Sequence, residues 1–239
     1  MDKIGIFWFR QDLRLHDNLG LSELIKKCKK IIPIYILDRD KELGSASKWW
    51  LHHSLDSLDK SLKLKNSQLF YFIGSPYLIL KKLVEDYNIA NIYWNRLYDQ
   101  YSIQRDTKIK TKFNIEVLTF KASLINEPWT IKNKSNSFFK VFTPYWKTCL
   151  EETLPIRLLK PPKIIQTFFI KSSQTTSLSD YKLFPKSASW INKLSSHWIP
   201  GEKQALISFT YFKDKLIENY DEGRDRPDKN YTSKLSPYL

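Results

Sequence analysis

Glycine, cysteine and methionine are all scarce in this sequence, which has six, two and one of them among its 239 residues. The glycines form neither the G-x-G-x-x-G fingerprint nor the phosphate-binding P-loop. We therefore expect no standard dinucleotide or nucleoside-triphosphate site in the first half of the chain. The two cysteines, Cys28 and Cys149, lie far apart and form no C-x-x-C or His/Cys pair that would indicate a metal site. They are typical of structural thiols in a reducing compartment.

Long hydrophobic runs are also missing. The apolar run near the N-terminus, residues 4–9, is too short for a signal peptide. No run approaches the roughly 20 apolar residues that a membrane-spanning helix needs. We therefore expect a soluble, cytoplasmic protein with no membrane partner.

Positive charge and apolar bulk, in contrast, are abundant. Lys and Arg number 39 against 25 Asp and Glu, a formal net charge of +14, which favours a polyanionic partner such as nucleic acid. Only 8 of the 39 are Arg, and the lysines are spread along the whole chain. The charge therefore permits nucleic-acid binding without showing it. Apolar residues at 42% and aromatic residues at 15% are enough for a sizeable core.

The first half of the chain alternates short apolar runs with amphipathic helical patterns. The runs have the length of buried strands and occupy residues 4–9, 31–37, 69–73, 89–94 and 115–120. This alternation predicts an α/β fold with a doubly wound, five-stranded parallel sheet over residues 1–126. Polar residues cluster after the first and fourth runs, at 10–18 and 95–99, where ligands bind in such sheets.

The pattern loosens after residue 126. Prolines 161 and 162 and the Ser/Thr-rich residues 172–179 indicate a long connector. We therefore place an interdomain connector at 127–199 and the start of a second domain at 200–239. There an amphipathic helix is predicted over residues 202–220, with an apolar stripe formed by Ala205, Leu206, Phe209, Phe212, Leu216, Ile217 and Tyr220.

The last twenty residues, 220–239, combine arginines with closely spaced hydroxyl groups. Hydroxyls and backbone N–H groups packed this closely are what a phosphate-bearing ligand needs from a loop. The alternative interpretation is a polar, disordered C-terminal tail.

Six stretches, in this order along essentially the whole chain and with the last in two pieces, resemble the DNA photolyase/cryptochrome family. They are WFRQDLRLHDN at 8–18, GSASKWWLHHSL at 44–55, WNRLY at 94–98, FKVFTPY at 139–145, PGE at 200–202, YDEGRD at 220–225 and TSKLSP at 232–237.

The resemblance implies an antenna-binding α/β domain, a connector, and the truncated start of an all-helical FAD-binding domain. It implies the light-driven, FAD-dependent repair of cyclobutane pyrimidine dimers by a deoxyribodipyrimidine photolyase. Arg224 would lie near bound DNA. The residues that would line the FAD site are Tyr220, Thr232, Ser233, Lys234, Leu235 and Ser236. This chemistry needs no general acid, base, nucleophile or metal, and we expect no catalytic residue of these kinds.

Two departures from the family pattern matter. The family's helical domain continues beyond the position of Leu239, so we expect the 239 residues alone to bind FAD poorly. A separately encoded C-terminal helical half is one partner that this implies. Folate-using members place Asn-Glu where this chain has Tyr101 and Ser102. The antenna chromophore is therefore unknown, with a deazaflavin, another chromophore or none as the alternatives.

Two other functions remain open on the same residues. One is a cryptochrome-type blue-light photoreceptor. The other is a non-enzymatic remnant or antenna-binding domain.

Several single residues have structural interpretations. We expect His16 to make local hydrogen bonds, and Arg10, Asp12 and Arg14 to form an ion-paired network that ties their loop to neighbouring elements. Residues His52 and His53 are adjacent on a predicted helix and point in different directions, which argues against a shared metal. Core packing is expected of Trp8, Trp49, Trp50 and Trp94.

Cutting the family fold at this point should expose apolar residues. We expect an uncovered patch at Phe209, Phe212, Leu216, Leu235 and Leu239, and a segment after about residue 200 that is mobile or drives association.

Overall fold

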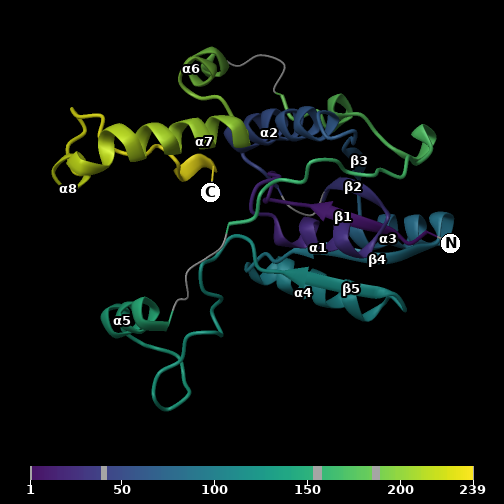
Figure 1. Ribbon diagram of the computed structural model, residues 1–239. Helices are drawn as coiled ribbons and strands as arrows, with labels where there is room; N and C mark the ends of the chain where they lie inside the picture. The colour runs from purple at the N-terminus through teal and green to yellow at the C-terminus, as the bar shows by residue number, and fades with distance from the viewer. Residues whose placement is uncertain (1, 39–41, 153–157, 185–188, 239) are drawn as a thin grey trace.

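The computed structural model describes residues 2–38, 42–152, 158–184 and 189–238. Its centre is a five-stranded parallel sheet with the strand order β3-β2-β1-β4-β5 (Figure 1). The strands are β1 (Ile4–Phe9), β2 (Lys30–Leu37), β3 (Phe70–Ile73), β4 (Ile89–Asn95) and β5 (Glu116–Phe120). Each begins and ends within one residue of the apolar run that predicted it.

Four helices cover the two faces of the sheet. They are α1 (Leu19–Lys27), α2 (Ser45–Lys63), α3 (Pro76–Tyr87) and α4 (Gln100–Thr111). Because successive strand side chains point to opposite faces, Phe7 and Phe9 pack in one core cluster with residues of α1 and α2. Ile6 and Trp8 pack in a second cluster with residues of α3 and α4. The predicted doubly wound α/β fold is confirmed.

Local signals set where the helices begin. The Asn18 side chain accepts a hydrogen bond from Leu21 N at 3.1 Å and caps α1. Asp99 caps α4 in the same way, through Ser102 N at 3.0 Å. Pro76 stands in the first turn of α3, where its missing N–H costs nothing.

Three of the four tryptophans expected in the core are buried there. Trp8, Trp49 and Trp94 are no more than 1% exposed, whereas Trp50 is only half-buried. Trp50 lies instead at the junction with the C-terminal segment, as described below.

The segment predicted as a connector contains ordered structure that the sequence patterns did not show. It includes α5 (Phe142–Glu152) and α6 (Trp190–His197). Part of it also follows the sheet, since Thr167 forms a parallel bridge with Ile31 and Thr176 an antiparallel bridge with Tyr71. The buried residues of segment 127–199 in the described ranges are Glu127, Ile131, Cys149, Ile165, Ile170, Tyr181 and Leu183.

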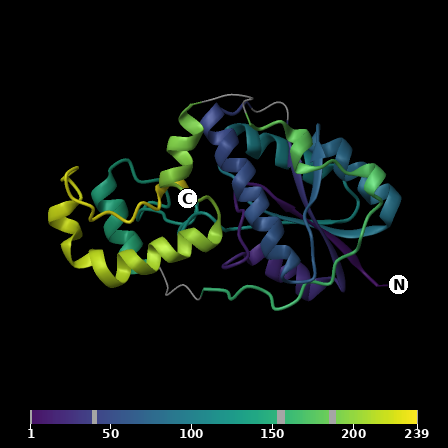
Figure 2. The same ribbon diagram turned by 90° about the horizontal axis from the view of Figure 1, so that it is seen from above.

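The C-terminal region begins with α7 (Glu202–Tyr211). The single helix predicted over 202–220 is wrong in detail, because a π-helical turn (Phe212–Leu216) and a 3₁₀ turn (Ile217–Asn219) separate α7 from the short α8 (Tyr220–Gly223). Seen from above, α5, α7 and α8 lie at one end of the molecule, away from the sheet (Figure 2). No helix in the described ranges is long and apolar enough to cross a membrane.

Candidate functional site

The C-terminal segment folds back on α8 through one close contact. Gly223, the last residue of α8, is buried, and a Cβ atom placed on it would lie 2.2 Å from Cδ2 of Tyr231. Only glycine permits this approach, because the Tyr231 ring and its Cβ both occupy the space of a side chain. The contact places the hydroxyl-rich residues 232–236 directly after the point where the chain passes α8.

Residues 232–236 form a turn that leaves their hydroxyl groups available. Lys234 adopts the left-handed conformation, with φ of +53°, and its side chain is exposed. Leu235 N donates a long hydrogen bond of 3.3 Å to Ser233 Oγ. Within the described part of the chain, the hydroxyls of Thr232 and Ser236 have no hydrogen-bond partner. Short hydroxyls on a turn of this kind suit the oxygens of a pyrophosphate, so these residues fit the FAD phosphates that the resemblance assigns to them.

Tyr220 begins α8, and Arg224 follows its last residue. The Tyr220 ring packs edge-on against Phe212, with centroids 5.7 Å apart, and is 37% exposed. The Arg224 side chain is 54% exposed and lies 3.5 Å from Asp225. In the described ranges no hydrogen bond joins Tyr220 to the hydroxyl segment, so the two are brought together only through the contact of Gly223 with Tyr231.

An aromatic cluster anchors the end of the segment to the α/β part. Tyr238 packs edge-on against Trp50 of α2, with centroids 5.0 Å apart, and donates a hydrogen bond of 2.9 Å to Ile199 O. Trp198 also packs on Trp50, at 6.0 Å. Sequence reasoning assigned Trp50 to the core and did not consider Tyr238. The half-buried position of Trp50 follows from this junction.

A second anchor is the carboxylate of Glu202 at the start of α7. It accepts hydrogen bonds from Leu15 N at 3.0 Å and His16 N at 2.7 Å, and lies 2.8 Å from His16 Nδ1. The expectation that His16 makes local hydrogen bonds is therefore wrong, since its partner is 186 residues away. Gly201, with φ of +112°, lets the chain reach α2, because a Cβ there would lie 2.2 Å from Ser57 Oγ. The Pro-Gly-Glu stretch was recognised only as a family motif, without this role.

The carboxyl end of the sheet holds a polar network that includes Arg10, Asp12 and Arg14. Arg10 pairs with Asp106, and Asp12 accepts a hydrogen bond from Arg10 N at 2.9 Å. Burial lowers the pKa of the Arg10 guanidinium, and the charge of Asp106 opposes that shift. Arg14 donates to Ala122 O at 2.7 Å. These contacts tie the loop to neighbouring elements, as expected, but the expected ion pairing is right only for Arg10. In the described ranges Arg14 binds backbone carbonyl oxygens, and Asp12 accepts from backbone and amide N–H groups.

The two residues at the folate-type position make contacts of their own. The Tyr101 hydroxyl donates to Asp38 at 2.9 Å. Ser102 is buried, and its Oγ has no hydrogen-bond partner in the described ranges. These contacts leave the identity of an antenna chromophore open.

The two adjacent histidines of α2 pack rather than ligate. Both rings contact Phe184, at centroid distances of 4.4 Å for His52 and 5.4 Å for His53. Their planes are nearly perpendicular, at 85°. Over the described residues, no group of three or more His, Cys, Asp and Glu side chains could hold a metal ion.

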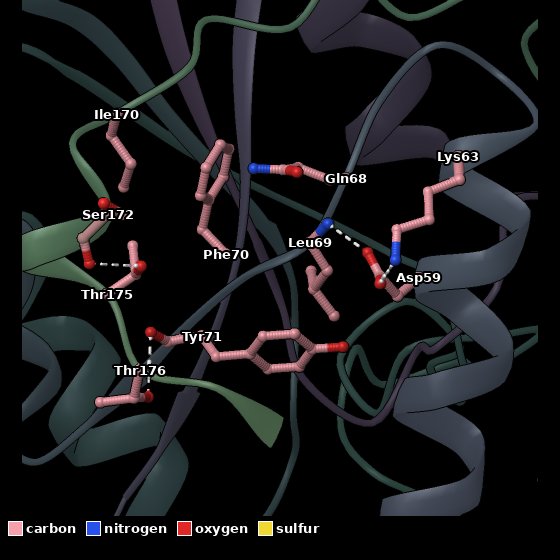
Figure 3. A pocket seen from close by; sticks show the side chains of 10 residues that line it. All are labelled: Asp59, Lys63, Gln68, Leu69, Phe70, Tyr71, Ile170, Ser172, Thr175 and Thr176. Carbon is pink, nitrogen blue, oxygen red and sulfur yellow. Dashed lines mark hydrogen bonds and ion pairs between the residues drawn. The ribbon is translucent and has the colours of Figure 1, made fainter. Parts of the chain in front are cut away.

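A cavity of about 210 Å³ lies at the β3 edge of the sheet, between α2 and the returning segment (Figure 3). Its lining includes the ion pair of Asp59 with Lys63, at 2.7 Å, and Thr176, which donates to Tyr71 O. The Tyr71 hydroxyl points toward the Asp59 side (Figure 3). None of the residues that the resemblance assigns to flavin or DNA lines this cavity.

Comparison with known proteins gives the wider context. The chain is similar to the deoxyribodipyrimidine photo-lyase of Agrobacterium fabrum, with 36% identity over 238 residues, covering 98% of this chain and 50% of that protein. It is 30% identical to Cryptochrome-2 of Arabidopsis thaliana over 250 residues, covering 100% of this chain and 41% of that protein. The chain thus spans about half the length of these curated relatives.

Comparison with solved structures points to the same family of proteins. A bacterial class III photolyase from Agrobacterium tumefaciens superposes with a TM-score of 0.94 at 35% identity, covering 100% of this chain and 50% of that one. The family model described as DNA photolyase matches residues 5–164. This match takes in the parallel sheet apart from Ile4, and with the agreement in fold over the entire chain it shows that the protein belongs to the DNA photolyase family.

Proposed function

We propose that this chain supplies the α/β domain and the first wall of the FAD site in a light-driven deoxyribodipyrimidine photolyase. The observation that carries the proposal is the hydroxyl turn at residues 232–236, whose free hydroxyls follow the close contact of α8 with Tyr231. The proposed substrate is DNA that contains cyclobutane pyrimidine dimers.

The chain's own residues have binding roles in this proposal. The hydroxyls and backbone N–H groups of the turn would hold the FAD pyrophosphate, and the exposed part of the Tyr220 ring would pack at the same site. When bound, FAD supplies the light-driven electron transfer that splits the dimer. The residues of the turn are Thr232, Ser233, Lys234, Leu235 and Ser236.

DNA contact is assigned to Arg224. Its guanidinium is half-exposed on α8's C-terminal side, and an exposed guanidinium can hold a phosphate with two parallel hydrogen bonds. The net charge of +14 would support this contact through the phosphate backbone.

We also propose the division into an α/β domain at 1–126, a connector at 127–199 and the start of the flavin domain at 200–239. In this arrangement the rest of the flavin site comes from the part of the family fold that these residues do not span. We propose a cytoplasmic location, which the two free, buried cysteines support.

The test compares the 239-residue chain alone with the chain plus the unmatched half of the Agrobacterium relative, made as a separate polypeptide. We expect the chain alone to lose FAD on dialysis. We expect the pair to retain it and to remove dimers from irradiated DNA only in light. A double variant, Thr232→Ala with Ser236→Ala, should weaken FAD retention by the pair. Stable FAD binding by the chain alone would contradict the proposal.

A cryptochrome-type photoreceptor is the second candidate, favoured by the similarity to Cryptochrome-2 over the full length of this chain. The same experiment separates the two functions. A pair that holds FAD and responds to light without removing dimers supports the photoreceptor. A pair that never holds FAD supports the non-enzymatic remnant or antenna-binding domain.

A further inference from the structure

Helix α5 carries an apolar stripe that the described part of the chain leaves uncovered. Phe142, Trp146 and Leu150 are spaced by four residues and so share one face of the helix. Their exposures are 70%, 50% and 63%. We call these three residues the α5 stripe.

Tyr145 and Cys149, three and seven residues after Phe142, border the stripe on one side, and this flank of α5 is packed. Cys149 is only 6% exposed, and Tyr145 is half-buried, with its ring 6.0 Å from that of Phe139. On the outer face the rings of Phe142 and Trp146 stack at an interplanar angle of 9°. The helix therefore presents ordered aromatic rings outward.

A second uncovered apolar surface lies on α7. Leu206, Ile207 and Tyr211 are 41%, 50% and 55% exposed. They line an open hollow of about 550 Å³, which we call the α7 hollow, with Lys203 and Asp214 on its lining as well. The two helices that carry these surfaces, α5 and α7, lie at the same end of the molecule, beyond the sheet (Figure 2).

Helices of the α/β part behave differently. The buried apolar residues of α1 and α2 belong to one core cluster, and those of α3 and α4 to the other. Among the large apolar side chains of these four helices, Leu78, Tyr101 and Ile103 stay exposed. Uncovered apolar surface is therefore concentrated on the helices outside the sheet, and concentrations of this kind mark interaction sites.

The comparisons indicate what covers these surfaces. The Agrobacterium photolyase superposes on 100% of this chain with a TM-score of 0.94, yet only 50% of that protein is matched. The family fold therefore contains a second part of similar length. We propose that the α5 stripe and the α7 hollow together form the surface that binds this second part of the fold. The proposal rests on the proposed function and gives the segment at 127–199 a docking role besides its role as a connector.

The experiment measures binding of the 239-residue chain to the unmatched half of the Agrobacterium relative, by isothermal titration calorimetry without FAD. We expect a one-to-one complex. The variant Phe142→Ser with Leu150→Ser should weaken it by about tenfold or more, because it removes apolar contact area from the interface. Ile207→Ser on α7 should weaken it independently.

The matched control is Lys147→Ser with Glu151→Ser, which changes two exposed polar residues of the same helix. It should leave the affinity within about twofold of the wild type. Circular dichroism of each variant checks that α5 remains folded.

Three results would overturn the inference. They are the absence of a complex, a complex that the stripe and hollow variants do not weaken, and self-association of the chain through the stripe. Adding FAD to the complex tests the proposed function separately. A complex that depends on the α5 stripe but takes up no flavin would contradict the proposed flavin site. The same result would still support the docking surface.

Discussion

At the scale of single residues, Glu202 links the start of α7 to the loop after β1. One carboxylate receives two backbone N–H groups and a histidine ring nitrogen from the loop after β1, and its side chain is 13% exposed. Charge-assisted hydrogen bonds of this kind are stronger than neutral ones. The contact fixes where α7 begins relative to the sheet.

Replacing Glu202 by Gln should destabilise the protein by about 1–2 kcal/mol, because the amide keeps only one acceptor oxygen and loses the charge. His16→Ala should cost less, since both backbone donors remain. Urea denaturation of the two variants provides the comparison. If both variants lose the same free energy of unfolding, the histidine ring, and not the backbone N–H donors, provides most of the stabilisation from this contact.

A second residue-scale prediction concerns Gly223. Alanine there would place its Cβ 2.2 Å from the Tyr231 ring and 2.5 Å from the Tyr231 Cβ. Such overpacking typically costs about 1–3 kcal/mol. We expect faster hydrogen exchange in residues 220–236. Gly44→Ala is the matched control, because nothing lies within 4 Å of its added Cβ, and it should leave exchange unchanged.

At the scale of elements, the two histidines of α2 make the stability of the fold depend on pH. Burial lowers the pKa of His52 from its ordinary value of 6.5, and burial together with the charge of His52 lowers that of His53. The unfolded chain therefore takes up protons first as the pH falls, so this stability is present above about pH 6.5 and is lost below it.

We expect the midpoint of urea unfolding to decrease between pH 7.5 and pH 5.5. In the variant His52→Gln with His53→Gln the decrease should be smaller. The other histidines are present in both proteins, so the difference isolates α2. An identical decrease in both proteins would mean that other groups cause the pH dependence.

The elements also show what the sequence could and could not predict. The strands were predictable because each is a short apolar run buried on both faces, as in residues 4–9. The break after α7 was not, because the residues at 212–220 keep helical spacing while the backbone changes to π and 3₁₀ turns. Helix α5 was not expected, because its segment contains Pro144 and proline ends most helices. Here Pro144 stands in the first turn, where it is tolerated.

The predicted C-terminal patch was right in part. Phe209 is 50% exposed, whereas Phe212, Leu216 and Leu235 are half-buried, and Leu239 lies outside the described residues. The half-buried residues find partners within the C-terminal segment itself, as the packing of Phe212 on Tyr220 shows. The larger uncovered surface on α5 was not anticipated.

At the scale of the whole molecule, the sheet class was predictable but the long-range contacts were not. Nothing in the local pattern shows that Thr167 bridges Ile31 or that Glu202 reaches Leu15. Such pairs depend on the route of the chain, which apolar periodicity does not encode. The flavin-site residues came from the family resemblance, and their assignment to FAD stays a prediction.

The two parts of the molecule should also differ in protease resistance. Residues after 200 have few buried side chains, while α1–α4 enclose two cores. Limited trypsin digestion should therefore cut first between Lys203 and Lys234. Binding of the unmatched half of the relative should protect this segment. Early cleavage within α1–α4 would contradict this order.

The span of the Glu202 contact also has a kinetic meaning. The carboxylate meets N–H groups that precede it by 186 and 187 residues, and contacts between such distant residues form slowly because most of the chain must first be brought together. The loop after β1 is synthesised well before α7, so this contact must wait for the chain between them. The sheet can therefore assemble before α7 is fixed against it, and the flavin site proposed at residues 232–236 would mature after the sheet.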